Sequence, residues 1–226
     1  MFFVTGTDTD VGKTLIGAGL LLAARKYSDT CFGIKPVAVG CETTPDGLRN
    51  DDALDLMRAS SVRLDYDEAN PVAFKHPAAP HIAVQLAGGT IDLEFLVKHC
   101  QTLAEKYPGF MLVEGAGGWR VPLNERQFIS DLPVRLKMPV ILVVAMRLGC
   151  ISHSILTVES IRRDGLEIAG WVANSVSEEM PYHGENLLML EKKIKAPLLG
   201  CVPFIENVSA ESVATHLNPG ILFSTK

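Results

Sequence analysis

The sequence predicts an α/β protein with a doubly wound, mostly parallel sheet that carries helices on both faces. Six short runs recur along the chain, and in each the apolar residues are mostly continuous rather than alternating with polar residues. Continuous apolarity is typical of strands that are covered on both faces, as in a parallel sheet. Segments of helical character lie between the runs, as right-handed crossovers require. With 226 residues, 47% of them hydrophobic, the chain is expected to form one domain over residues 1–226.

The expected elements follow in chain order. Strands are predicted at residues 2–5, 32–35, 110–114, 140–145, 168–174 and 198–202, where the apolar runs lie. Helices are predicted in the intervals, at residues 13–26, 51–59, 91–107, 128–137, 151–164 and 182–194. Residues 64–89 carry three prolines and form a long connection. Because such connections are uncommon and usually functional, we expect an excursion over the sheet edge rather than a second domain.

Composition excludes several classes of partner. The net charge is -5, and no cluster of lysine and arginine indicates binding to nucleic acid or to an anionic membrane. The sequence contains no stretch of about 18 consecutive apolar residues, which would predict a membrane span. The five cysteines are too dispersed to bind zinc together, so we expect them to be reduced thiols in a cytoplasmic protein. The spacing of the histidines does not match a zinc-binding motif either. Small molecules are the expected partners.

The first strand runs into a loop that resembles a phosphate-binding loop. Five residues separate Gly6 from Gly12-Lys13-Thr14, where the usual pattern has four. The context of strand, loop and helix supports the pattern, because loop N–H groups and the helix dipole favour a phosphate there. Lys13 would reach the β and γ oxygens, and the Thr14 hydroxyl would bind Mg²⁺. A fold of the P-loop NTPase type is then expected. The alternative for this loop is an ordinary turn between strand and helix, in which Lys13 is solvated and binds no phosphate.

Two carboxylates are candidates for the same Mg²⁺, which takes one or two carboxylates together with phosphate oxygens and water. Glu114 ends an apolar strand and precedes a run with three glycines, whose backbone amides are free to approach a ligand. Asp52 stands at a helix start. Its alternative role is to cap that helix or complement the helix dipole.

Lys35 is the residue expected to carry the chemistry. It follows Ile34 at the end of a short apolar strand, close to where the loop amides converge. The alternative is a lysine whose stem covers apolar surface while its ammonium lies in water.

Ten motifs together resemble one family nearly end to end. They are FVTGTDTDVGKT from Phe3, GIKPVAVG from Gly33, LRNDDAL from Leu48, NP at Asn70, PHIA at Pro80, LVEGAGGW from Leu112, PVILVV from Pro139, LGCISH from Leu148, GWVAN from Gly170 and PLLGCVP from Pro197. With these motifs the chain resembles the dethiobiotin synthetase family, in which the longer loop is normal. That family carboxylates 7,8-diaminononanoate with CO₂ to form the cyclic urea dethiobiotin, using ATP and Mg²⁺.

The resemblance implies a nucleotide site and a metal site. Thr14, Asp52 and Glu114 would hold Mg²⁺, and Lys13 and Lys35 would act in catalysis. The nucleotide would be bound by Thr9, Asp10, Val11, Gly12, Lys13, Thr14, Leu15, Asp52, Glu114, Gly115, Ala116, Gly117, Asn174 and Pro203. Within this set, the Asn174 amide would read adenine and Pro203 would lie beside the base. Without the resemblance, Asn174 is equally a turn residue after a strand.

The resemblance also implies how the diamine is held. The diamine-binding residues would be Thr9, Lys35, Val39, Gly149, Cys150, Ile151 and Ser152. Residues 149–152 open a helix, whose N–H groups suit a carboxylate. In the family this segment comes from the neighbouring subunit, which implies an isologous homodimer with active sites near the interface. Val39, Ala79 and Ser152 depart from the family, whose members commonly carry serine, serine and asparagine there.

Two further functions are compatible with such a loop. A regulatory P-loop ATPase that switches a protein partner would share the sheet and the elongated Gly-Lys-Thr loop. Its usual second lysine early in the loop is replaced here by Asp8. An amidotransferase synthetase domain is the other alternative, but no room remains for a fused glutaminase.

Overall fold

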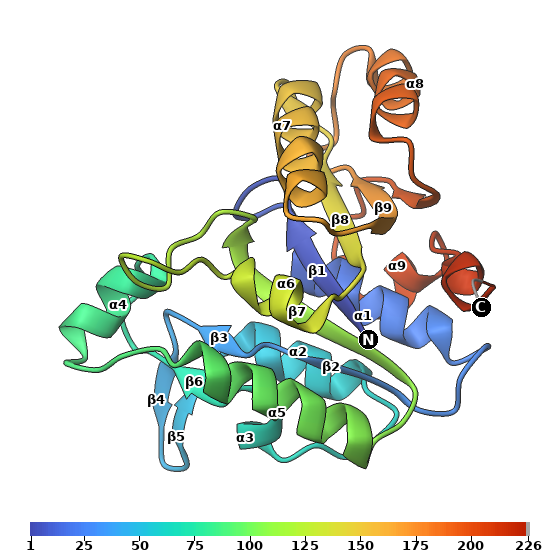
Figure 1. The fold of residues 1–226 in the computed structure, drawn as a ribbon. Coiled ribbons are helices and arrows are strands. Elements are labelled where there is room, and N and C mark those ends of the chain that lie inside the picture. The colour runs from blue at the N-terminus through green and yellow to red at the C-terminus, as the bar shows by residue number, and fades with distance from the viewer. Residues whose placement is uncertain (225–226) are drawn as a thin grey trace.

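A six-stranded parallel sheet forms the centre of the computed structural model, which describes residues 1–224 (Figure 1). The strand order is β10-β9-β8-β1-β7-β2, and every neighbouring pair is parallel. The strands are β1 (Phe2–Gly6), β2 (Cys31–Ile34), β7 (Phe110–Gly118), β8 (Val140–Ala145), β9 (Ile168–Asn174) and β10 (Leu198–Val202). The predicted fold class is confirmed, and all six predicted strands are present.

Helices cover both faces of this sheet. One face carries α1 (Lys13–Ala24), α2 (Asp51–Ala59), α9 (Ala210–Ala214) and the 3₁₀ helix η1 (Pro219–Phe223). The other face carries α5 (Leu93–Lys106), α6 (Asp131–Leu136), α7 (Cys150–Arg163) and α8 (His183–Ile194). Figure 1 shows α5, α6 and α7 in front of the sheet and α1 and α2 behind it.

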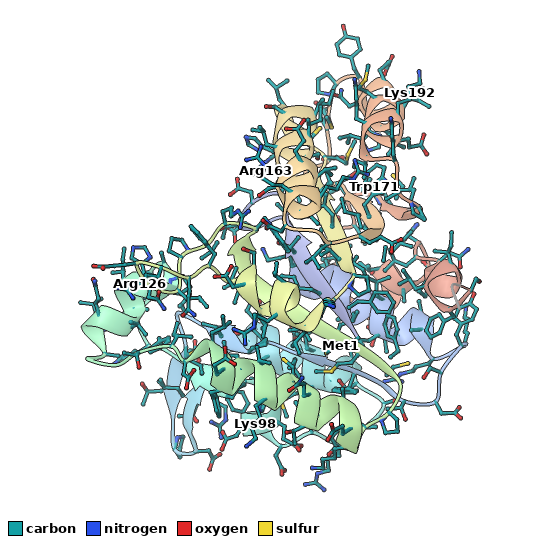
Figure 2. All side chains as sticks on the ribbon, in the orientation of Figure 1. Met1, Lys98, Arg126, Arg163, Trp171 and Lys192 are labelled. Carbon is teal, nitrogen blue, oxygen red and sulfur yellow. The ribbon has the colours of Figure 1, made fainter. Side chains whose placement is uncertain are left out.

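The two helical layers explain why the strands are apolar throughout. Along β8, Ile141 and Val143 enter the core beneath α1, whereas Leu142 and Val144 enter the core beneath α7. Because successive side chains of a strand point to opposite faces, both sets must be apolar when both faces are covered. Trp171 of β9, labelled in Figure 2, is fully buried in the α7 core.

Residues 37–86 hold small elements that the sequence did not indicate. They are β3 (Val37–Ala38), β4 (Glu42–Thr44), β5 (Gly47–Arg49), α3 (Tyr66–Ala69), β6 (Val72–Ala73) and α4 (Pro80–Leu86). The expected excursion at residues 64–89 therefore contains two short helices and a strand. It is fixed to the edge of the sheet, since β6 pairs with β3 and the Lys35 N–H donates to the Ala69 carbonyl at 2.8 Å.

Several predicted boundaries were wrong. The strand at 110–114 continues to Gly118, so Glu114 is not its last residue; the glycines stay in the strand because Gly118 still pairs with Gly6 of β1. Helix α5 begins at Leu93 rather than residue 91, since the Asp92 side chain caps it by accepting from the N–H groups of Glu94 and Phe95.

Within residues 1–224, no helix combines the length and apolarity that a membrane crossing requires.

Replacing each of two helical glycines by alanine should change the free energy of unfolding in opposite directions. A Cβ on Gly19 of α1 would lie 2.7 Å from the Val213 Cγ1 of α9, whereas a Cβ on Gly184 of α8 would meet nothing within 4 Å. Alanine in a helix gains up to about 1 kcal/mol over glycine, while overpacking costs about 1–3 kcal/mol. Gly19→Ala should therefore lower the free energy of unfolding in urea, and Gly184→Ala should raise it slightly. Equal effects of the two variants would contradict this packing of α9 on α1.

Candidate active site

A cavity of about 390 Å³ lies beside the loops that follow β1 and β2. It is lined by Thr9, Asp10, Gly12, Lys13, Thr14, Leu15, Lys35, Val39, Asp52, Asp55, Glu114, Ala116 and Gly117. The carboxyl ends of parallel strands share one edge of a sheet, where ligands of doubly wound folds bind. The cavity therefore brings most of the predicted site residues together from four separate segments.

The phosphate loop is shaped by one glycine at the start of α1. Gly12 has φ +86°, in the left-handed region, and a Cβ there would lie 2.4 Å from Nδ2 of Asn174. No side chain caps the first turn of α1, so its N–H groups are available to a ligand in the cavity. This is the geometry that the loop sequence predicted.

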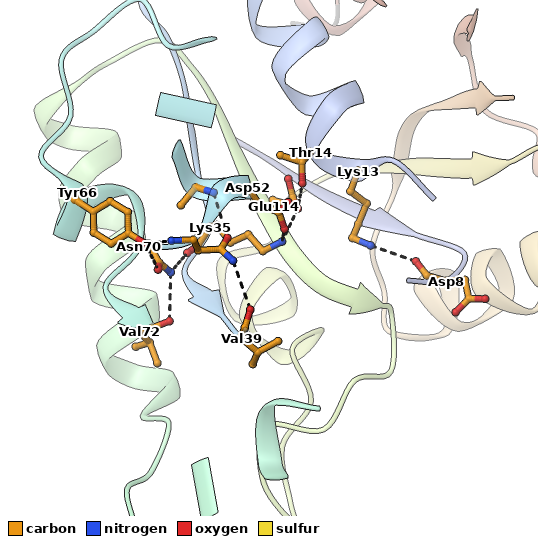
Figure 3. A network of polar contacts seen from close by, with 12 residues as sticks. Asp8, Lys13, Thr14, Lys35, Val39, Asp52, Tyr66, Asn70, Val72 and Glu114 are labelled. Atoms are coloured by element: carbon orange, nitrogen blue, oxygen red, sulfur yellow. Dashed lines mark hydrogen bonds and ion pairs between the residues drawn. The ribbon is translucent and has the colours of Figure 1, made fainter. Parts of the chain in front are cut away.

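Two carboxylates pair with the ammonium of Lys35, and one of them also accepts from a threonine hydroxyl (Figure 3). The Lys35 Nζ donates to Oδ2 of Asp52, and to Oε1 of Glu114 at 2.8 Å. The Thr14 hydroxyl donates to the same Oε1 at 2.8 Å. Glu114 is 2% exposed and Lys35 is 6% exposed, so this is a largely buried cluster of one cation and two anions. Lys35 is therefore no solvated surface lysine.

Burial and charge act in opposite directions on these groups. Burial alone would lower the pKa of Lys35, but the nearby carboxylates of Glu114 and Asp52 outweigh it, so the pKa is raised. Burial would raise the pKa of Asp52, but the Lys35 ammonium outweighs it, so the pKa is lowered. Both shifts favour the charged pair.

The backbone of Lys35 is held by a separate chain of hydrogen bonds (Figure 3). The Asn70 side-chain amide donates to the Lys35 carbonyl at 2.7 Å, and the Tyr66 hydroxyl donates to Oδ1 of Asn70 at 3.0 Å. The Asn50 N–H in turn donates to the Tyr66 oxygen at 2.7 Å. Asn50 caps α2, the helix of Asp52, so both partners of the ion pair are positioned by one network.

Lys13 also lines the cavity, at the start of α1. Its Nζ donates to the Asp8 carbonyl at 3.2 Å, and its side chain is largely buried. Burial lowers the pKa of Lys13, and the Glu114 carboxylate partly opposes this shift. The Asp8 carboxylate pairs with Arg147 at 2.7 Å, which ties the loop to the segment after β8.

A divalent cation suits part of this cluster. Within the described part of the chain, no three His, Cys, Asp or Glu side chains gather into a metal site. Asp52, Glu114 and the Thr14 hydroxyl nevertheless offer the oxygen ligands that Mg²⁺ prefers, with phosphate oxygens and water to complete the shell. Oε2 of Glu114 is buried and has no hydrogen-bond partner, although an unpaired buried oxygen is costly. A cation at that oxygen would satisfy it.

Other predicted residues do not line the cavity. Val11 is buried in the core and its carbonyl accepts from the Asn174 side-chain amide at 2.9 Å, while Gly115 packs against the Phe3 ring. Asn174 thus supports the loop, and reading of adenine by its amide stays a prediction. Pro203 is exposed after β10.

Residues 149–152 lie at the start of α7, outside the cavity of their own chain. Asp55 lines the cavity but was missed, although its position one helical turn after Asp52 was a signal for it.

Sequence comparison identifies the family. Residues 1–212 match the family described as AAA domain. The chain is 48% identical over 217 residues to an ATP-dependent dethiobiotin synthetase BioD of Cellvibrio japonicus, covering 96% of this chain and 95% of that one. An ATP-dependent dethiobiotin synthetase BioD of Chromohalobacter salexigens is 50% identical over 212 residues, with 89% of each chain covered. This chain belongs to the dethiobiotin synthetase family. The resemblance predicted from the ten motifs is confirmed, and membership in the dethiobiotin synthetase family makes the chain an ATP-dependent ligase.

Solved structures share the fold at much lower identity. A ParA family ATPase from Chlorobium tepidum superposes with TM-score 0.53 at 14% identity, covering 99% of this chain and 93% of that one. MinD in the MinC:MinD cell division protein complex of Aquifex aeolicus gives TM-score 0.57 at 14% identity, with 95% and 84% covered. These likenesses show that this dethiobiotin synthetase family member has the fold of P-loop ATPases.

The pairing of Asp52 with Lys35 should be visible in the pH dependence of stability. A folded-state pKa below the ordinary value of 3.8 adds stability at neutral pH that is lost as pH falls through the folded pKa. Asp52→Asn should lower the free energy of unfolding at pH 7 by less than about 1 kcal/mol, because the carboxylate is 43% exposed.

Urea unfolding from pH 7 to pH 3 should show the difference between Asp52→Asn and wild type shrinking as Asp52 protonates. Asp51→Asn is the matched control, since Asp51 also lies in the first turn of α2 but is exposed. A deficit that stayed constant over this range would contradict the pairing.

Proposed function

We propose that this chain carboxylates 7,8-diaminononanoate with CO₂, using ATP, to form dethiobiotin, ADP and phosphate in biotin biosynthesis. The family supports the reaction, and one geometric observation supports its location. The Lys35 ammonium lies where two carboxylates, the phosphate loop and the cavity meet. A cation at this position can face both a bound triphosphate and an anionic acceptor.

The proposed reaction has three steps. A neutral amine of the substrate attacks CO₂, forms a C–N bond and loses a proton to give a carbamate. A carbamate oxygen then attacks the γ-phosphorus of ATP and displaces ADP, giving a carbamic-phosphoric anhydride. The second amine attacks the carbamate carbon, expels phosphate and closes the cyclic urea.

Charge compensation is the main demand that these steps place on the protein. A carbamate and a triphosphate repel each other, and two unit charges at about 4 Å interact by about 4 kcal/mol at an effective dielectric of about 20. Lys13 and Lys35, which both line the cavity, would offset this repulsion. Bound Mg²⁺, held by Thr14, Asp52 and Glu114, would neutralise charge on the phosphate oxygens. Phosphoryl transfer otherwise needs mainly positioning, so no dedicated protein base is required.

The distal carboxylate of the substrate needs an anion site away from the phosphates. The first turn of α7 is suitable, because Gly149 adopts φ +94° and no side chain caps the helix. Since this turn does not reach the cavity of its own chain, we propose that a second copy supplies it in an isologous homodimer. Two exposed apolar side chains beside it, Leu148 (99% exposed) and Leu156 (62% exposed), support such an interface. A fully active monomer in analytical ultracentrifugation would refute this arrangement.

A protein-regulating switch ATPase is less well supported. Its characteristic second lysine in the loop is replaced by Asp8, whose carboxylate is paired with Arg147. The likeness to MinD and ParA proteins is one of fold and does not extend to a partner.

The proposed function is tested by supplying labelled bicarbonate, Mg-ATP and 7,8-diaminononanoate to the purified protein. Label should appear in a cyclic urea in proportion to ADP release, and omission of the diamine should abolish ADP formation. ATP hydrolysis that continued without the diamine and yielded no urea would refute the proposal.

Lys35→Gln should separate chemistry from nucleotide binding. We expect kcat to fall about 100-fold, as for loss of one charge-stabilising group in an active site, while Kd for Mg-ATP changes by less than about threefold. The reason is that the phosphate loop and Lys13 are untouched. Lys98→Gln is the matched control, since Lys98 is an exposed lysine of α5 (Figure 2). Equal losses in kcat and in ATP affinity would contradict the role of Lys35.

A further inference from the structure

A polar junction joins the end of β7 to the last turn of α7. The Trp119 indole Nε1 donates to Oδ2 of Asp164 at 2.8 Å, and Nη2 of Arg120 donates to Oδ1 of Asp164 at 2.6 Å. Both carboxylate oxygens are thus taken by the two residues that directly follow the glycine segment 115–118. The Asp164 side chain is only 15% exposed, so its bonds are better shielded from water than those of a typical surface pair.

Arg120 extends the junction to α6. Its Nε donates to the Ser160 hydroxyl of α7 at 3.0 Å, and its Nη1 donates to the hydroxyl of the buried Ser130 at 3.2 Å. Its guanidinium also lies over the Phe128 ring, 5.6 Å from the centroid. All three guanidinium nitrogens are therefore engaged, and a rigid planar fork of this kind fixes the geometry between the elements it joins.

The middle of the glycine segment is held by less strand pairing than its ends, where Gly115 packs against the Phe3 ring and Gly118 pairs with Gly6. Ala116 and Gly117 line the cavity, and Gly117 has φ +63°. The pairing of β7 with β1 shifts register between Val4 and Gly6, so a regular ladder does not continue alongside residues 115–117. Glycines have no side chains to anchor and are conformationally free. The position of this backbone in the cavity therefore depends on the anchoring of the residues that follow.

The same junction also fixes α7. Asp164 is the C-cap of this 14-residue helix, which is about 20 Å long. Just before its other end, Nη2 of Arg147 pairs with Oδ2 of Asp8 in the phosphate loop at 2.7 Å. Helix α7 is thus tied at both ends to segments that border the cavity, and its first turn is the proposed anchor for the substrate carboxylate.

We propose that Asp164, Arg120 and Trp119 form one positioning unit that sets the backbone of residues 115–117 and the orientation of α7. None of the three touches the cavity, so they act through the glycine segment and the helix. The kinetic consequences rest on the proposed function. The structural consequence, a more mobile glycine segment when the unit is broken, does not.

The test uses the full-length protein with Asp164→Ala, Arg120→Gln and the double variant. For Asp164→Ala we expect kcat to fall about tenfold and KM for the diamine to rise several-fold, because small misplacements of reacting groups are costly. KM for ATP should rise by a smaller factor, because residues 115–117 belong to the predicted nucleotide set whereas residues 10–15 are untouched. The double variant should be no slower than the worse single variant, as expected for residues that act as a unit.

Amide hydrogen exchange supplies a readout that does not depend on turnover. Exchange at residues 115–118 and 150–153 should accelerate in Asp164→Ala and stay at wild-type rates in Glu94→Gln, which removes the exposed ion pair with Arg135 between α5 and α6. If Asp164→Ala does not fold, Asp164→Asn, which keeps an acceptor for Trp119, should show the same changes to a smaller degree.

Wild-type exchange rates at both segments, with only the melting temperature lowered, would overturn the positioning unit and leave the proposed function intact. A wild-type protein that formed no cyclic urea would instead refute the proposed function. The exchange rates would then decide on the positioning unit alone.

Discussion

A buried ammonium between two carboxylates sets the arrangement of the sheet edge that borders the cavity. Burying the Lys35 charge is expensive unless it is paired, and Asp52 and Glu114 supply the pairing from α2 and β7. Asp52 is partly exposed whereas Glu114 is 2% exposed, so removing Glu114 would cost more than removing Asp52, which leaves Lys35 paired with Glu114. The ion cluster therefore locks three chain segments to one another, and the two carboxylates that hold the lysine can also offer oxygens to a magnesium ion, Glu114 through its unpaired Oε2.

The phosphate loop depends on a second constraint, the close approach of β9. Asn174 donates to the Val11 carbonyl and lies so near Gly12 that no side chain fits there. A residue at the end of one strand thereby supports the loop that follows another, two strands away in the sheet. In a parallel sheet such support is available because all strands end at the same edge.

The comparison with ParA and MinD proteins separates what the fold provides from what the family adds. The fold is common to all of them. The features on which the proposed carboxylation and ring closure depend are particular side chains placed on that frame. They are Lys35 after β2, the carboxylates around it, and the uncapped first turn of α7. Function is decided at such sites rather than by the architecture.

The sequence by itself determined the parallel sheet, its six strands, the phosphate loop and the family, because continuous apolar runs and local motifs are properties of short segments. It also indicated Lys35, Asp52 and Glu114 individually. Only the tertiary structure decided that these three form one cluster, that β7 runs on to Gly118, and that Asn174 supports the loop. The sequence likewise did not predict the small elements between residues 37 and 86 or the junction of Arg120 with Asp164. Both depend on contacts between residues that are far apart along the chain. Such contacts depend on how the layers pack, and no local pattern in the sequence encodes them.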